Sequence, residues 1–150
     1  IYKRGFMEVN VNYLAVLLAA ISTMIVGATW YTPKVFGNRW MKLAKVKVDR
    51  DNISSSQMAV MYGGVFLASL ISAYVLAHVI ALSNNFFHNS FLQDALSTGF
   101  WLWLGFTACR IFTHDVFENR PRALTVLNSA HELVTVLVMA LIIGLMGQYY

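Results

Sequence analysis

The chain has 150 residues, of which 58% are hydrophobic and 12% are charged. Soluble domains carry about 25% charged residues, and a fold of this size buries only about two-thirds of its chain, so the composition excludes an ordinary soluble domain. The net charge of +4 does not indicate nucleic-acid binding, because the basic residues lie beside hydrophobic segments.

Four hydrophobic stretches follow one another along the chain, at about residues 11–31, 58–82, 91–111 and 123–147. As a helix, each is long enough to cross roughly 30 Å of hydrocarbon. The third carries Asp94 and Arg110 near its ends and is the least apolar. We therefore predict an all-α polytopic membrane protein with four transmembrane helices. Its length allows one domain, residues 1–150, and the lone Cys109 excludes an internal disulfide.

The basic residues indicate how the spans are oriented. Nine of the eleven fall in or beside the loops after the first and third spans: Lys34, Arg39, Lys42, Lys45, Lys47, Arg50, Arg110, Arg120 and Arg122. The positive-inside rule puts both loops in the cytoplasm or matrix and both termini outside. A bacterial or mitochondrial inner membrane is the expected location.

The loop after the first span has a helical pattern from Phe36 to Lys47. Apolar residues recur on one face and basic residues on the other, which is typical of a helix lying in the membrane interface. Ser54 and Gln57 have the spacing of a capping box that begins the second span. The residues expected at lipid headgroups are Trp30, Tyr31, Arg39, Trp40, Lys42 and Lys45.

Small residues at four-residue spacing predict where helices pack closely, because association in lipid depends on backbone approach rather than on the hydrophobic effect. The first span offers Ala19, Thr23 and Gly27, and the second offers Gly64, Ala68 and Ser72. A further small face in the second span contains Ser69, Ala73, Ala77 and Ala81. Two small faces on one helix predict contacts on two sides and a central position for the second span.

Trp101 and Trp103 point to opposite sides of the third span. At least one of them is expected to pack inside the protein, where its indole N–H needs an acceptor.

The fourth span contains the only charged side chain expected deep in the membrane, where an ionised group costs free energy. Asn128, His131, Glu132 and Thr135 form one polar stripe at helical spacing. Glu132 lies about 14 Å from the inner end of the span, and an ionised carboxylate at such depth costs at least about 2.5 kcal/mol unless it is paired or hydrated. Residues expected at the same depth are Ser22, Thr23, Gly64 to Ser69 and Trp101 to Leu104, whereas Arg110 is expected nearer the inner surface.

Three interpretations of this stripe remain open: a polar seam between helices or subunits, a proton or solute pathway through Glu132, and a cofactor or lipid site using His131. Bound lipid is the favoured ligand, and a pigment or haem is a weaker one. His131-Glu132-Leu133-Val134-Thr135 begins like the zinc motif H-E-x-x-H but ends in threonine, so no metal site is expected. Hydrolase and phosphate-loop motifs are missing from the sequence, and we expect no catalytic residues.

The sequence resembles domain-of-unknown-function family 1761. The resemblance rests on Gly27-Ala28-Thr29-Trp30-Tyr31 with Pro33, Phe36, Gly37 and Trp40, and on Trp103-Leu104-Gly105-Phe106. It extends through Phe117, Arg120, Pro121, Asn128 and Gly144. What the resemblance implies is a four-helix membrane fold without an assigned activity.

We therefore expect a non-enzymatic structural or accessory subunit of a membrane assembly, or a homo-oligomer. The expected partners are membrane lipids and other membrane subunits or copies of the chain, and not nucleic acid. The alternatives are a small transporter or proton-conducting protein that uses Glu132, and a cofactor-binding or lipid-binding membrane protein.

Overall fold

The computed structural model describes residues 9–46 and 53–147, and all regular structure within them is helical. The elements are α1 (Tyr13–Trp30), α2 (Gly37–Ala44), α3 (Ser55–Phe87), α4 (Phe91–Leu102), the π-helical segment η2 (Trp103–Ala108), α5 (Cys109–Phe117) and α6 (Arg122–Met146). The prediction of an all-α fold is confirmed for these residues.

Three of the described helices, α1, α3 and α6, are long and apolar enough to cross a membrane. These three indicate a membrane protein. The region predicted as the third span is divided into α4, η2 and α5, none of which reaches that length by itself. The backbone nevertheless stays helical through both junctions, because Leu102, Trp103, Ala108 and Cys109 all have right-handed helical dihedral angles.

The ends of the helices follow local signals. α1 begins where the side chain of Asn12 accepts a hydrogen bond from the Ala15 N–H at 3.1 Å. α3 begins with the predicted capping box between Ser54 and Gln57, which is confirmed. α3 extends five residues beyond the predicted end at residue 82, to Phe87. The apolar pattern could not locate this end, because polar residues follow residue 82. One of them, Asn84, donates hydrogen bonds to the Asn89 carbonyl at 2.9 Å and to Asp94 at 2.8 Å.

The predicted amphipathic helix in the first loop forms as α2, although Lys47 lies outside the described residues. Arg39, Lys42 and Lys45 are exposed, whereas Trp40 and Leu43 are half-buried. α2 contacts α6, so its apolar face is partly covered by protein.

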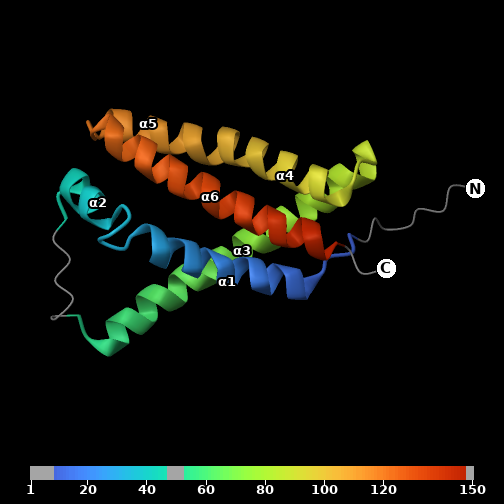
Figure 1. The fold of residues 1–150 in the computed structure, drawn as a ribbon, viewed down its shortest axis with the longest axis horizontal. Coiled ribbons are helices and arrows are strands. Elements are labelled where there is room, and N and C mark those ends of the chain that lie inside the picture. Colours follow the sequence, from blue (N-terminus) through green and yellow to red (C-terminus); the bar gives the residue numbers. More distant parts are fainter. Residues whose placement is uncertain (1–8, 47–52, 148–150) are drawn as a thin grey trace, which may run out of the picture.

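Successive long segments run in alternating directions, so α1 begins and α6 ends at the same end of the molecule (Figure 1). α6 contacts every other helical element, and its largest interfaces are with α4 and α1. The prediction that the second span is central is therefore wrong: α6 is the central helix, and α3 packs mainly on α1 and α4.

The core is rich in alanine and lies at one end of the bundle. Its buried members come from the first half of α1, the second half of α3, α4 and the second half of α6: Ala15, Val16, Ala19, Ala20, Ala73, Leu76, Ala77, Ile80, Ala95, Met139, Ala140 and Ile143. A Cβ atom added at Gly144 would lie 2.9 Å from the Cβ of Ala95, so α4 and α6 are in close backbone contact there. Such contact is how helices gain packing energy in lipid.

The two small faces of α3 have different environments. Ala73, Ala77 and Ala81 are buried, and the Ser69 hydroxyl accepts a hydrogen bond from Thr23 of α1 at 2.7 Å. Gly64, Ala68 and Ser72 are exposed. The packing predicted for this second set therefore does not form within the chain, because the set lies on the side of α3 opposite the buried face. In α1, Ala19 and Thr23 are buried and Gly27 lies against α6.

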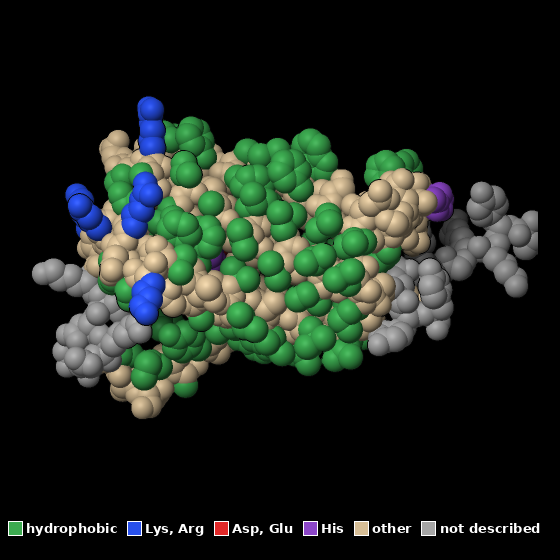
Figure 2. Space-filling view, viewed as in Figure 1, with side chains coloured by type: hydrophobic (Ala, Val, Ile, Leu, Met, Phe, Trp, Pro, Cys, Tyr) green, Lys and Arg blue, Asp and Glu red, His purple; other side chains and the backbone are tan. Residues whose placement is uncertain are grey.

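The end of the molecule that carries α2 and the turn between α5 and α6 is called here the basic end. The described lysines and arginines are Lys34, Arg39, Lys42, Lys45, Arg110, Arg120 and Arg122, in or next to these elements. Figure 2 shows lysine and arginine side chains gathered at this end, whereas the long sides of the visible face are largely hydrophobic. An apolar belt beside a basic end is the charge pattern of a membrane protein.

Candidate functional site

A tight corner at the basic end holds α2 against the end of α1. Gly37 is buried there, and a Cβ atom at this position would overlap the backbone carbonyl oxygens of Tyr31 and Thr32. The Gly37 N–H donates to the Thr32 carbonyl at 2.9 Å, and the Phe36 N–H donates to the Trp30 carbonyl at 3.1 Å. Only glycine permits this close approach, which turns the chain sharply between α1 and α2.

The corner assembles an aromatic cluster around His131. The Trp30 ring lies 4.5 Å from Phe36 and 5.7 Å from the His131 ring, as centroid distances. Tyr31 lies 5.0 Å from His131 and 5.3 Å from Trp40. Trp30 and Tyr31 thus contact His131 of α6, and Trp40 contacts Tyr31. The contact of these aromatic residues and of the exposed Arg39, Lys42 and Lys45 with lipid headgroups stays a prediction.

His131 itself is almost enclosed, with its side chain 13% exposed. Its Nδ1 atom lies 3.3 Å from Oε1 of the adjacent Glu132. Its Nε2 atom is buried without a hydrogen-bond partner among the described residues, and a Cβ atom at Gly27 would lie 3.8 Å from it. A haem or pigment held through His131 does not fit, because one ring nitrogen faces α1 and the other faces Glu132.

The four residues of the predicted polar stripe divide into two environments. Asn128 and Glu132 line an open pocket, and the Glu132 side chain is 40% exposed. His131 packs on α1, and Thr135 is buried with no partner for its hydroxyl among the described residues. The stripe is therefore not one continuous polar seam, since its members face both α1 and the pocket.

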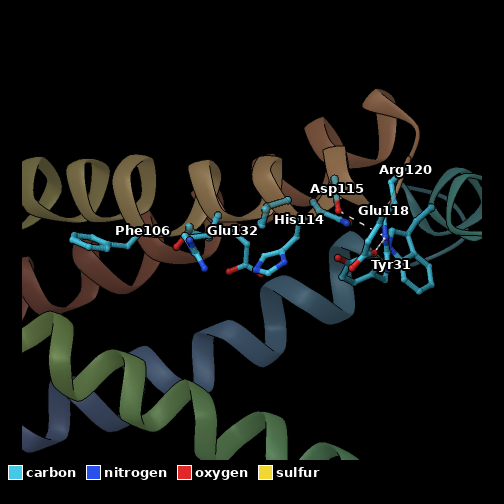
Figure 3. A pocket seen from close by; sticks show the side chains of 12 residues that line it. Tyr31, Phe106, His114, Asp115, Glu118, Arg120 and Glu132 are labelled. Atoms are coloured by element: carbon cyan, nitrogen blue, oxygen red, sulfur yellow. Dashed lines mark hydrogen bonds and ion pairs between the residues drawn. The ribbon is translucent and has the colours of Figure 1, made fainter.

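The pocket has a volume of about 540 Å³ and lies between the α1–α2 corner, η2, α5 and α6. Its lining combines aromatic, polar and charged side chains: Tyr31, Trp40, Phe106, Thr107, Arg110, Ile111, His114, Asp115, Glu118, Arg120, Asn128 and Glu132. Figure 3 shows Phe106 toward one end and Asp115, Glu118 and Arg120 toward the other. The pocket is thus amphipathic along its length.

Ion pairs and hydrogen bonds fix the charged end of the pocket. Asp115 is buried and accepts a hydrogen bond from the Thr125 hydroxyl of α6 at 2.7 Å. Arg120 pairs with Glu118, and its Nε atom lies 3.8 Å from Oδ1 of Asp115. These contacts join the end of α5 to the beginning of α6.

Several of these residues were not predicted as site residues. Arg110 was expected to lie nearer the inner surface than Glu132. It is exposed and forms no ion pair with Glu132 among the described residues, and the two side chains line the same pocket. Of the residues expected at the depth of Glu132, none lines the pocket. The four-residue spacing of Arg110 and His114, which places them on one helical face, was the signal that could have found the α5 side. The π-helical form of η2 has no comparable sequence signal.

Trp103 packs inside the protein, as predicted for at least one of the two tryptophans of the third span. Its indole N–H donates to the Ser129 carbonyl of α6 at 2.9 Å, whereas Trp101 is 62% exposed. Trp103 begins η2, so this bond ties the π-helical segment to α6 beside the pocket. Such segments within α-helices are frequently found at functional sites.

A model of the family described as protein of unknown function (DUF1761) matches residues 14–144. The chain belongs to this family. Comparisons with curated proteins and with solved structures gave no match.

Some of the DUF1761 residues that carried the resemblance meet at the pocket, whereas Gly144 packs on α4 in the other half of the bundle. Gly37 forms the corner, and Tyr31, Trp40, Phe106, Arg120 and Asn128 are among the lining residues. These positions come from four separate parts of the chain, and the fold brings them to one place. Within residues 9–46 and 53–147 no group of three His, Cys, Asp or Glu side chains is arranged to hold a metal ion.

A second candidate site in this DUF1761 protein is the beginning of α3, called here the exposed half of α3 (Ser55 to Ser72). Every residue from Ser54 to Val65 is exposed, including Val60 at 77% and Tyr62 at 55%. A Cβ atom at Gly63 or Gly64 would meet no atom within 4 Å. Figure 1 shows this part of α3 diverging from α1 toward the basic end.

Proposed function

We propose that this DUF1761 protein is a non-enzymatic integral membrane protein that works as a homo-oligomer or as an accessory subunit of a membrane assembly. The observation that carries the proposal is the exposed half of α3. Its small residues Gly64, Ala68 and Ser72 are exposed on the side of the helix opposite the face that packs on the chain's own bundle.

The proposed topology has four spans, with Phe91–Phe117 as the third. Its support is the helical backbone that continues from α4 through η2 to α5, together with the uncharged run from Ala95 to Cys109. The gathering of the described basic residues at the basic end supports an orientation with this end in the cytoplasm or matrix. Both termini are then outside, and the membrane is a bacterial or mitochondrial inner membrane.

The length of α3 also supports association. Its 33 residues span about 50 Å, whereas the hydrocarbon is about 30 Å thick, so the helix must tilt or extend beyond it. A tilted helix leaves the chain's own bundle over part of its length. The exposed small residues then allow a second helix to approach closely, which is a main source of helix association in lipid.

The experiment is the oligomeric state of purified protein in mild detergent, measured by size-exclusion chromatography with light scattering. We expect the unaltered chain to be an oligomer and Gly64→Leu to be mostly monomeric, because leucine prevents close backbone approach. Gly63→Leu is the matched control, since Gly63 is equally open but lies about 100° around the helix. A monomeric unaltered chain without co-purifying subunits would contradict the proposal.

A further inference from the structure

Some charged side chains of the pocket are paired within the chain, and others are not. Arg120 is paired with Glu118 and approaches Asp115, and Asp115 also binds Thr125. Arg110, by contrast, has no carboxylate oxygen within 4.0 Å among the described residues. Glu132 has only the adjacent His131 as a neighbour of that kind.

One cation and one anion therefore line the same pocket from facing helices without touching. Arg110 belongs to α5 and Glu132 to α6. Arg110 is exposed and the Glu132 side chain is 40% exposed, so both charges are accessible to a ligand from outside the chain. Arg120 and Glu118, by contrast, are paired with each other.

The surroundings of the two charges indicate what kind of partner fits. Tyr31 and Trp40 present aromatic rings on the α1–α2 side, a surface that attracts ammonium groups. His114 lies on the same face of α5 as Arg110, and both offer N–H donors suited to an anionic oxygen. Phe106 and Ile111 add apolar surface beside these polar groups.

We propose that the pocket binds the zwitterionic headgroup of a membrane phospholipid, with the phosphate held by Arg110 and the ammonium group held by Glu132. The acyl chains lie along the apolar part of the lining that includes Phe106. A lipid with only negative charge leaves Glu132 facing an anion. A cationic amphiphile leaves Arg110 unpaired. The volume of about 540 Å³ is within the range of about 300–1,000 Å³ of small-molecule sites.

The test measures binding to the full chain in detergent by native mass spectrometry, supported by ligand-induced shifts in the unfolding temperature. The probes are dioctanoyl phosphatidylethanolamine, dioctanoyl phosphatidylglycerol and the water-soluble glycerophosphoethanolamine. We expect the unaltered chain to bind the ethanolamine lipid about tenfold more tightly than the glycerol lipid, as one charge-assisted contact allows. The soluble headgroup should bind much more weakly than either lipid.

The variants separate the two charges. Glu132→Gln should lose the preference for the ethanolamine lipid while it still binds the glycerol lipid. Arg110→Gln should weaken both by about tenfold, and Arg110→Lys should restore part of the binding. Arg122→Gln removes a positive charge that does not line the pocket, and binding should not change. Unfolding without ligand is compared for each variant, so that a loss of fold is recognised.

Three results would overturn the proposal. Equal binding of the two lipids by the unaltered chain would show that Glu132 does not recognise an ammonium group. Unchanged binding by a folded Arg110→Gln variant would remove the phosphate contact. Equal affinity for the soluble headgroup and the lipid would assign the pocket to a free zwitterion instead.

Discussion

Gly37 determines the shape of the pocket although it does not line it. Its backbone lies against the carbonyl oxygens of Tyr31 and Thr32, which leaves no room for a side chain. Through this contact the chain turns sharply, and Trp40 comes to lie on Tyr31. Gly37, which has no side chain to contribute, thus positions the Tyr31 and Trp40 rings that line the pocket.

We predict that Gly37→Ala destabilises the protein by about 1–3 kcal/mol, because a methyl group forced against backbone atoms must displace α2. The measurement is the unfolding temperature in detergent, with tryptophan fluorescence to report the movement of Trp40 away from Tyr31. Gly63→Ala is the control, since nothing lies near that position. Equal unfolding temperatures for the two variants would show that the corner adapts without cost.

At the residue scale, the sequence allowed the helical spacing of the polar residues around Glu132 to be predicted, but not their partners. The spacing of Asn128, His131, Glu132 and Thr135 places them on one side of a helix, and the structure agrees with that. Whether two adjacent side chains face the same neighbour depends on the positions of α1 and α5, which periodicity does not contain. His131 packs on α1 for this reason, and Glu132 opens to the pocket.

Among the elements, α6 organises the packing of the fold, because it contacts all the other helical elements. Its second half packs through small and medium side chains, and Gly144 lies so close to α4 that an added Cβ would be 2.9 Å from Ala95 and from Leu92. Its first half carries Asn128 and Glu132 and borders the pocket. One helix thus provides both the tightest packing and the polar site.

We predict that Gly144→Leu separates α4 from α6 and lowers stability by more than the roughly 1–3 kcal/mol typical of overpacked cores, because the neighbouring atoms include backbone. Thermal unfolding in detergent measures this. Gly63→Leu places the same side chain at an open position of α3 and should unfold within a few degrees of the unaltered chain. If Gly144→Leu unfolded like this control, the close α4–α6 contact would be wrong.

The existence of the long helices was predictable, because the length of an apolar stretch and the position of its flanking charges can be read from the local sequence. The four stretches correspond to α1, α3, the path from α4 to α5, and α6. The position of the central helix was not predictable in this way. Gly64, Ala68 and Ser72 have the same spacing as buried small residues elsewhere, yet they are exposed, since spacing identifies a face and not what covers it.

As a whole, the molecule has two unlike halves. The half away from the basic end contains the alanine-rich core shared by α1, α3, α4 and α6. Toward the basic end the exposed half of α3 diverges from α1 (Figure 1), and the pocket lies between α5, α6 and the α1–α2 corner. The packed half holds the helices together, while the open half presents the pocket and the surface proposed for association.

The exposed half of α3 is the feature on which the proposed function depends. If it is a contact between copies, Ala68 of one chain lies near Ala68 of another across a two-fold axis. Tyr62 is also exposed but is about 120° away around the helix, so it lies outside such a contact. The lone cysteine makes this testable, because Cys109→Ser gives a background without cysteine.

The most direct measurement is oxidative cross-linking in native membranes, with Ala68→Cys or Tyr62→Cys introduced into the Cys109→Ser chain. The account predicts a disulfide-linked dimer for Ala68→Cys that disappears on reduction, and little or none for Tyr62→Cys at equal expression. Cross-linking of neither variant, or of both to the same extent, would contradict association of two copies through this face of α3.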